Sequence, residues 1–346
     1  YLAERIVNHA PNTAFAILFI CAMTSFLSAF VENVATVLII APVALSLAKK
    51  LNINPVNMMV AIAISSNLQG CATLIGDPPS MLLGGFAKMT FMDFFFYHGK
   101  PGIFFAVQLG AITSILYLYF VFRHHKEKTK LILVETVQSW VPTVLLSLLI
   151  LTLAVSSFFD KGFSFLAGMI CMAFALVTLL WQRSNHKTGI IENVKKLDWD
   201  TTFFLMAVFI VVESLTQTGW ITKISDFLSN QVGDNLFFGY ALLIIMSVII
   251  SGFVDNVPYL AAMLPVAIQM SEKLQVNPAL LMFGLLIGAS LGGNLTPIGA
   301  SANIVACGIL KKEGHIVSFP RFMKISVPFT IVAVLPAVAL VWFIWS

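Results

Sequence analysis

One stretch of this sequence occurs twice, and the second copy follows the first at a constant offset of 223 residues. Residues 28–43 read SAFVENVATVLIIAPV, and residues 251–266 read SGFVDNVPYLAAMLPV. The same offset pairs QGCATLIGDPPS (69–80) with GGNLTPIGASAN (292–303). More than a third of the positions between residues 28 and 76 are identical to their counterparts. A chain that contains two such copies is expected to fold into two units of one architecture.

The sequence around these copies is too apolar for a soluble protein. It is 59% hydrophobic and 10% charged, with a mean hydropathy of +0.93, whereas soluble domains carry about 25% charged residues. Apolar runs of about 20 residues recur, which is the length that crosses roughly 30 Å of hydrocarbon. The net charge of +4 is modest and the basic residues lie in loops, so no nucleic-acid partner is expected. We predict an all-α, polytopic membrane protein surrounded by membrane lipid.

Each copy interrupts its apolar sequence in two ways. A carboxylate and an amide divide residues 13–48 and 235–271, at Glu32–Asn33 and Asp255–Asn256. The arms are short for full spans, so we expect two re-entrant helical hairpins. Glycine and proline divide residues 56–88 and 279–310, because glycine frees φ and proline blocks helix continuation. We expect two discontinuous helices there.

These elements define two repeats. Residues 1–122 form the first, which ends with a span at 101–122, and 123–137 form a cytoplasmic linker. Residues 138–346 form the second, with scaffold spans in 138–220 and a last span at 325–345. Because three spans precede the second hairpin and none precedes the first, we expect the first repeat to be truncated, with about 90 further residues upstream.

The basic residues predict how the repeats insert. If three spans precede each hairpin, the two repeats have inverted topology. One face then holds 15 of the 20 Lys and Arg residues, which places that face in the cytoplasm. Its basic loops include residues 123–130, 183–196 and 311–324. This distribution predicts a multi-pass protein of the plasma membrane.

Carboxylates at membrane depth are the first candidates for chemistry. A carboxylate such as Glu32 or Asp255 costs about 2.5–3.5 kcal/mol at the bilayer centre, and such residues usually mark ion or proton pathways. Each could bind a cation, carry a proton or cap a helix N-terminus, and these roles are compatible. Asn33 and Asn256 offer a donor and an acceptor beside them.

The unwound helices offer a second set of ligands, because a broken helix leaves free carbonyl and N–H groups. We predict an ion or substrate site that also includes Asn67, Gly70, Thr73, Gly76, Asp77, Asn294, Thr296, Gly299, Ser301 and Asn303. Coupling Na⁺ is predicted at Glu32, Asn33 and Thr73, and at Asp255, Asn256 and Thr296. No other cofactor is expected. Asp77 has no carboxylate counterpart, since position 300 is Ala.

The doubled motifs and the GDPPS turn resemble the ion transporter superfamily. Within it they are similar to citrate-transporter-like permeases, which include arsenite-efflux permeases, D-type sodium/proton antiporters and the P protein. The resemblance implies inverted repeats, a homodimer and elevator-type alternating access. Sodium/divalent-anion symporters of the superfamily carry Ser-Asn-Thr at each tip, whereas only Asn33 and Asn256 match here. This departure favours the arsenite, antiporter and P-protein branch.

We therefore expect a secondary active transporter of a small inorganic or organic anion, of the arsenite, oxyanion or citrate class, linked to H⁺ or Na⁺. A Na⁺/H⁺ antiporter is the alternative, and a passive anion channel is a minor one. An enzyme is not expected. An intramembrane aspartyl protease would need Gly where Leu74 precedes Ile75-Gly76-Asp77.

Overall fold

The structure is a computed structural model that describes residues 10–51, 53–125, 139–159, 165–186, 190–195, 197, 199–233 and 235–346. The described chain is almost entirely helical, as predicted; its one sheet is the two-stranded hairpin β1 (Phe96–Tyr97) and β2 (Lys100–Pro101). Most of the predicted linker 123–137 lies outside the described residues.

The first repeat contains a helical hairpin followed by a broken helix. Helices α2 (Thr13–Ser28) and α3 (Asn33–Leu51) are joined by a four-residue tip, 29–32. Helix α4 (Val56–Gly70) stops at the predicted break, and α5 (Pro78–Ala87) resumes where two prolines occupy its first turn. Proline is favoured there because the first N–H groups of a helix have no intrahelical partner. The short 3₁₀ turn η1 (Met92–Phe94), the β-hairpin and α6 (Ile103–Phe122) follow.

The second repeat has the same order of elements. Helices α12 (Leu236–Ser251) and α13 (Asn256–Lys273) form the hairpin, with its tip at 252–255. Helix α14 (Pro278–Gly292), the turn η2 (Gly293–Leu295) and α15 (Ser301–Lys312) form the broken helix, and α16 (Phe319–Trp345) ends the chain.

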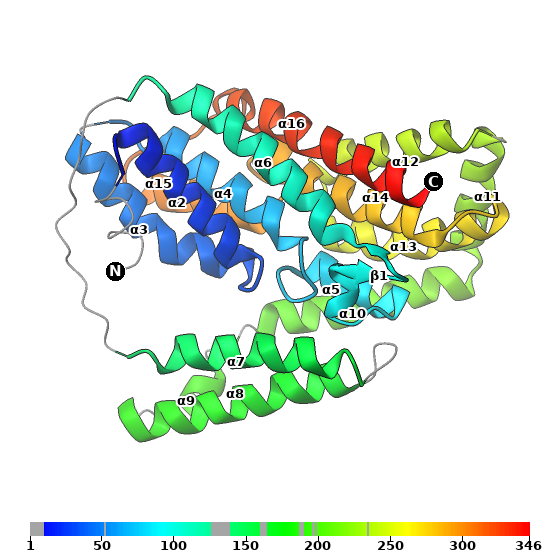
Figure 1. Cartoon of the computed structure of the whole chain (residues 1–346), viewed down its shortest axis with the longest axis horizontal. Helices are drawn as coiled ribbons and strands as arrows, with labels where there is room; N and C mark the ends of the chain where they lie inside the picture. The colour runs from blue at the N-terminus through cyan, green and yellow to red at the C-terminus, as the bar shows by residue number, and fades with distance from the viewer. Residues whose placement is uncertain are drawn as a thin grey trace.

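The two repeats interlock rather than pack as separate bodies. Helix α15 of the second repeat packs on α3 and α4 of the first, and α13 packs on α5. The equivalent helices α6 and α16 lie side by side (Figure 1). Helices α4 and α14 form the centre, because nearly every residue of both is buried. This arrangement brings both tips and both breaks toward one region.

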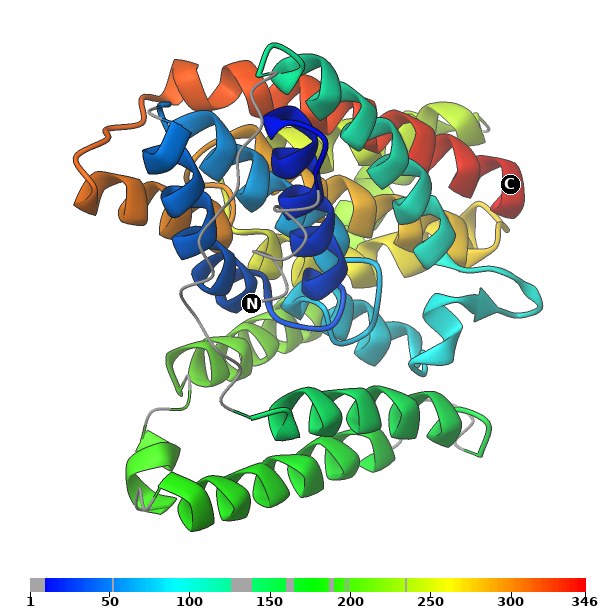
Figure 2. The same cartoon turned by 60° about the vertical axis from the view of Figure 1, so that its left-hand side comes forward.

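A second layer lies against this interlocked body. It consists of α7 (Val141–Ser156), α8 (Phe165–His186), the short α9 (Ile190–Lys195) and α10 (Trp199–Gln217) (Figures 1 and 2). The third of the scaffold spans predicted in 138–220 covers residues 199–220. It ends earlier in the structure, because the chain bends by 70° between α10 and α11 (Trp220–Val232). Gly219 lies at the bend with φ +75°, a conformation that glycine adopts without steric cost.

Among the described residues, five helices are long and apolar enough to cross a membrane, or six if the bent pair counts as one span. They include α6, α8 and α16, and the central α14 together with η2. The fifth is α3, the second arm of the first hairpin. Helices α2, α7 and α12 are apolar but shorter, at 16 residues each.

Candidate functional site

The two hairpin tips place their carboxylates at helix N-termini. An Oε atom of Glu32 accepts a hydrogen bond from the Ala35 backbone N–H at 3.0 Å. An Oδ atom of Asp255 accepts one from the Val257 N–H at 2.9 Å. Such caps stabilise a helix by about 1 kcal/mol. Both carboxylates are exposed beyond their caps, so capping leaves them free to contact an ion.

Asp77 occupies the equivalent position at the break in the first repeat. One of its carboxylate oxygens accepts the Ser80 N–H at 2.9 Å and thereby caps α5. The side chain is only 1% exposed, and its second oxygen has no hydrogen-bond partner. A buried, unpaired carboxylate oxygen is costly. Asp77 is therefore a strong candidate to receive a proton or a cation.

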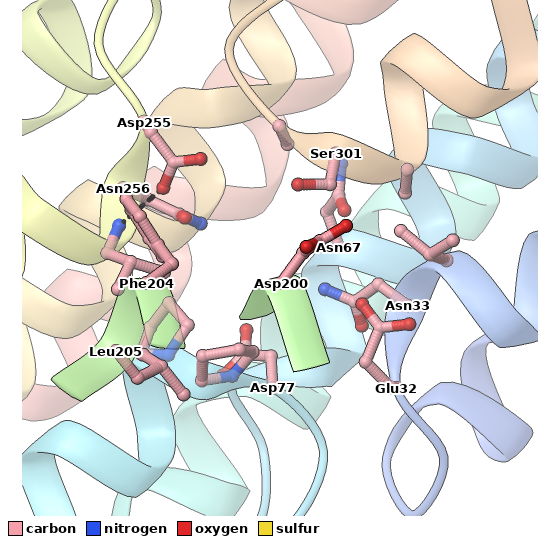
Figure 3. A pocket seen from close by; sticks show the side chains of 16 residues that line it. Glu32, Asn33, Asn67, Asp77, Asp200, Phe204, Leu205, Asp255, Asn256 and Ser301 are labelled. Atoms are coloured by element: carbon pink, nitrogen blue, oxygen red, sulfur yellow. Dashed lines mark hydrogen bonds between the residues drawn. The ribbon is translucent and has the colours of Figure 1, made fainter. Parts of the chain in front are cut away.

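The tips and breaks enclose one cavity of about 380 Å³. Figure 3 shows Glu32 and Asp255 on opposite sides of it, with Asp77 and Ser301 also facing the space. Helix α10 of the second layer closes part of the wall with three side chains. The full lining consists of Glu32, Asn33, Val34, Asn67, Asp77, Pro78, Pro79, Asp200, Phe204, Leu205, Asp255, Asn256, Val257, Ala300, Ser301 and Ala302.

The lining combines two opposite electrostatic features. It contains four carboxylates, and the described lining residues include no Lys, Arg or His. It also contains the first residues of α3, α5, α13 and α15, whose N-terminal ends carry partial positive charge. Three of these N-termini are capped by their own carboxylates. The N-terminus of α15 has no side-chain cap, because Ala300 stands where the first repeat has Asp77.

An amide network joins the two repeats behind the cavity. The Asn67 side-chain N–H₂ donates to Asn294 Oδ1 at 2.8 Å and to Asn303 Oδ1 at 3.0 Å. Asn294 donates in turn to the Ile64 carbonyl at 3.2 Å. Asn303 donates to the carbonyls of Gly293 and Thr296 at 3.0 and 2.9 Å. The network fixes α4, which lines the cavity through Asn67, against the second break.

Each break is attached to the tip of its own hairpin by the same hydrogen bond. Thr73 Oγ1 donates to the Ala29 carbonyl, and Thr296 Oγ1 donates to the Gly252 carbonyl. The four residues are equivalent at the repeat offset. Each hydroxyl is therefore engaged by its tip, outside the cavity lining.

The glycines at the breaks permit close backbone approach. A Cβ atom on Gly76 would lie 2.3 Å from the Gly70 carbonyl oxygen, and one on Gly299 would lie 2.6 Å from the Gly293 oxygen. A Cβ atom on Gly70 would collide with the Asn33 side chain. Only glycine fits these positions without a shift in the neighbouring backbone or side chain.

The structure divides the predicted site residues into two groups. Seven line the cavity: Glu32, Asn33, Asn67, Asp77, Asp255, Asn256 and Ser301. The other seven lie behind it and shape it: Gly70, Thr73, Gly76, Asn294, Thr296, Gly299 and Asn303. Within the described chain, no three His, Cys, Asp or Glu side chains converge closely enough to hold a metal ion.

The sequence did not predict that α10 contributes side chains to the cavity wall. Asp200, Phe204 and Leu205 line the cavity, although Asp200 reads in the sequence as an anchor at the membrane interface. The repeat offset gives no signal for α10, because its counterpart would precede residue 1. The other missed residues are the neighbours Val34, Pro78, Pro79, Val257, Ala300 and Ala302.

Several known proteins are similar to this chain in sequence. A family model described as "Citrate transporter" matches residues 1–283 and 241–346. An "Uncharacterized transporter" of Synechocystis sp. is 30% identical over 370 residues, covering 100% of this chain and 80% of that protein. The mouse "P protein" is 27% identical over 410 residues, covering 95% of this chain and 49% of its own length.

A solved structure has a similar fold. The crystal structure of the Alcanivorax borkumensis YdaH transporter matches with a TM-score of 0.60 at 12% identity. The match covers 98% of this chain and 79% of that one. The solved structure shows the fold, and since the family model spans the chain, this chain is an integral, multi-pass membrane transporter, not an enzyme, and belongs to the citrate transporter family.

Proposed function

We propose that this protein is a secondary active transporter of a small anion, organic or inorganic, which enters the cavity together with H⁺ or Na⁺. The observation that carries the proposal is the composition of the cavity wall. Four carboxylates with no basic side chain among the described lining residues would repel a bare anion. The uncapped N-terminus of α15 and the Ser301 hydroxyl nevertheless offer donors to an anion.

The proposal assigns different roles to the two breaks. The unpaired oxygen of Asp77, with Glu32 nearby in the first tip, is the proposed position of the cation or proton. The first turn of α15 is the proposed position of the anion. Binding of the cation lowers the repulsion that the anion meets, so neither is expected to bind well alone.

Purified protein in proteoliposomes tests this coupling. Uptake of radiolabelled citrate and arsenite would be measured under an imposed H⁺ or Na⁺ gradient, and without either gradient. We expect at least one anion to accumulate only with a gradient. Unlabelled anion added outside afterwards should accelerate the efflux of the accumulated label. Anion flux that equilibrates without a gradient and shows no exchange acceleration would identify a passive channel instead.

A Na⁺/H⁺ antiporter is the second candidate, because carboxylates dominate the cavity wall. In that case the cation is the substrate and α15 contributes only its dipole. The same liposomes distinguish the two functions. An antiporter exchanges ²²Na⁺ for protons in the absence of any added anion, whereas the proposed symporter moves neither ion without its anion.

We further propose that transport proceeds by an elevator motion of the interlocked repeats against the layer α7–α10. The cavity is lined by α10 together with residues of both hairpins, so such a motion would carry the site past a fixed wall. Phe86 on α5 and Phe209 on α10 are in ring contact, with centroids 6.2 Å apart. Cysteines at both positions, cross-linked in a background without native cysteines, should stop transport, and reduction should restore it.

The predicted inverted topology and homodimer belong to the same proposal. Exposed Lys311 and Lys88 are equivalent at the repeat offset and are expected on the cytoplasmic and outer faces, so Lys311→Cys and Lys88→Cys should react with an impermeant thiol reagent from opposite sides. Reaction of both from one side would contradict the inversion. The mass of the detergent-solubilised protein by light scattering would test the dimer.

A further inference from the structure

The first repeat contains a second cavity, which the transport site does not use. It has a volume of about 230 Å³ and lies between α2 and α6. Phe26 and Phe30 near the first tip, together with Phe104 and Ile112 on α6, provide most of its apolar wall. Gln69 of α4 and Gln108 of α6 provide a polar part.

Helices α2 and α6 contact each other at the ends that lie away from the first tip. There the Ala14 N–H donates to the His125 carbonyl at 3.0 Å, and the rings of Phe15 and Tyr119 lie 5.9 Å apart. Toward the tip, Gln69 and Gln108 exchange two hydrogen bonds of 2.9 Å each and bridge α4 to α6. Each amide thereby satisfies one donor and one acceptor of the other.

The second repeat has different residues at the equivalent positions, and its hairpin packs directly on its broken helix there. Gly292 and Ile331 replace Gln69 and Gln108 at the repeat offset. A Cβ atom on Gly292 would lie 2.7 Å from the Cα atom of Val248, so the backbone of α12 packs directly on α14. Larger side chains, Ile245 and Val334, also stand where the first repeat has Ala22 and Ala111.

We propose that the cavity between α2 and α6 binds one acyl chain of a membrane lipid. Phe26 is 67% exposed and Ile112 is 59% exposed, and in a membrane protein these side chains face hydrocarbon. An apolar cavity of about 150 Å³ in a protein core already binds a molecule the size of benzene, so the larger volume here admits a length of hydrocarbon. The bilayer supplies that hydrocarbon at high concentration.

The bound chain would act on the first hairpin alone. It would contact Ala29 and Phe30, and the Ala29 carbonyl is the group that Thr73 holds. The bound acyl chain would thus stabilise the tip that carries Glu32, from the side that faces away from the transport cavity. The second repeat lacks the glutamine pair and packs α12 directly on α14, so only the first hairpin is expected to respond to the acyl composition of the membrane.

Photo-cross-linking tests the site. The protein would be reconstituted with phosphatidylcholine that carries a diazirine in one acyl chain, irradiated and mapped by mass spectrometry. We expect labelling of residues 22–30 and 104–115 to exceed that of their counterparts 245–253 and 327–338 at least fivefold. Labelling that is equal in the two repeats would show ordinary contact with lipid and would overturn the proposal.

Cavity-filling variants sharpen the test. Ala22→Ile with Ala111→Val introduces the residues of the second repeat and should reduce labelling of 22–30 at least fivefold. Because Ala111 is buried, the single variant Ala22→Ile serves if the double variant does not fold, and Val177→Ile on the exposed face of α8 is the matched control. Unchanged labelling in a folded Ala22→Ile protein would also refute the site.

Discussion

The two repeats of this transporter share a set of hydrogen bonds that holds each hairpin tip against its helix break, here called the frame. They differ in the side chains that stand on this frame. In both, a threonine attaches the break to the hairpin tip, and a side chain seven residues further on binds the first glycine carbonyl of the break. That side chain is Ser80 in the first repeat, at 3.3 Å from Gly70, and Asn303 in the second, at 3.0 Å from Gly293. The frame is therefore set by side-chain hydrogen bonds to backbone carbonyls at equivalent positions of the two repeats.

The contents of the frame differ at the positions that face the cavity. Asp77 caps its helix in the first repeat, and its counterpart Ala300 leaves the helix end open. Asn67 belongs to the amide network, whereas the hydroxyl of its counterpart Ser290 is buried without a partner. A symmetric scaffold thus presents an asymmetric site, with negative charge at one break and free N–H groups at the other.

Exchanging the residues of the two breaks should have the largest effect. Asp77→Ala makes the first break resemble the second, and Ala300→Asp does the reverse. Each change removes or adds a full charge at a proposed binding position, so we expect it to reduce gradient-driven uptake by about 100-fold, which corresponds to about 2.8 kcal/mol. Uptake in proteoliposomes, normalised to folded protein, measures this.

Ala300→Asn provides the control for that exchange. Asparagine caps a helix as aspartate does but adds no charge. If the free N–H groups bind the anion, Ala300→Asn should also lose uptake. If it transports normally while Ala300→Asp does not, charge alone matters and the proposed anion position on α15 is wrong.

Neutralising the tips should have the next largest effect. Glu32→Gln and Asp255→Asn keep an oxygen that can accept the capping hydrogen bond, so they remove charge with little change in the cap. We expect each to lower coupled uptake roughly tenfold, or about 1.4 kcal/mol, or to uncouple ion flux from anion flux. Equal anion and cation fluxes in parent and variants would assign both carboxylates to capping only.

Substitution of the glycines at the breaks should lower the free energy of unfolding by about the same amount in the two repeats. Gly76→Ala and Gly299→Ala force a Cβ atom against a carbonyl oxygen, which costs roughly 1–3 kcal/mol. Thermal unfolding in detergent compares them with Gly308→Ala on α15, where no atom lies within 4 Å of the added Cβ. A variant of one repeat that unfolds like Gly308→Ala would show that the frame is not shared.

The smallest effect is expected at the threonine attachments. Thr73→Val and Thr296→Val each remove one hydrogen bond to a tip carbonyl, worth about 0.6 kcal/mol within a membrane. Thr152→Val removes only a bond within exposed helix α7 and is the matched control. Should the two attachments differ by several-fold in unfolding or uptake, the hairpins do not depend on them equally.

The repeat explains why so much of the architecture could be predicted from the sequence. The pattern placed both tips and both breaks, and helices α3 and α13 begin at Asn33 and Asn256, within the predicted tips. The residue types could not show which way each side chain points. Thr73 is predicted to bind Na⁺, and the sequence gives no sign that its hydroxyl also donates to a carbonyl of the tip, a contact that depends on how closely the tip approaches the break.

Elements without a counterpart in the chain were harder to predict. Asp200 reaches the cavity because α10 lies against α13, and a contact between distant elements leaves no local pattern. The bend at Gly219 was missed for a different reason. The apolar run continues to Trp220, and hydropathy does not report the left-handed conformation of one residue.

The amide network also imposes an order on biogenesis. Asn67 finds its partners only when Asn294 and Asn303 have been made, 227 and 236 residues later in the chain. At 5–20 residues per second, translation of that interval takes roughly 10–50 seconds. During this time the polar end of α4 lies in or near the membrane with its amide unmatched. The Asn67 amide must therefore be hydrogen-bonded by water or by the insertion machinery until the second half of the protein has been inserted.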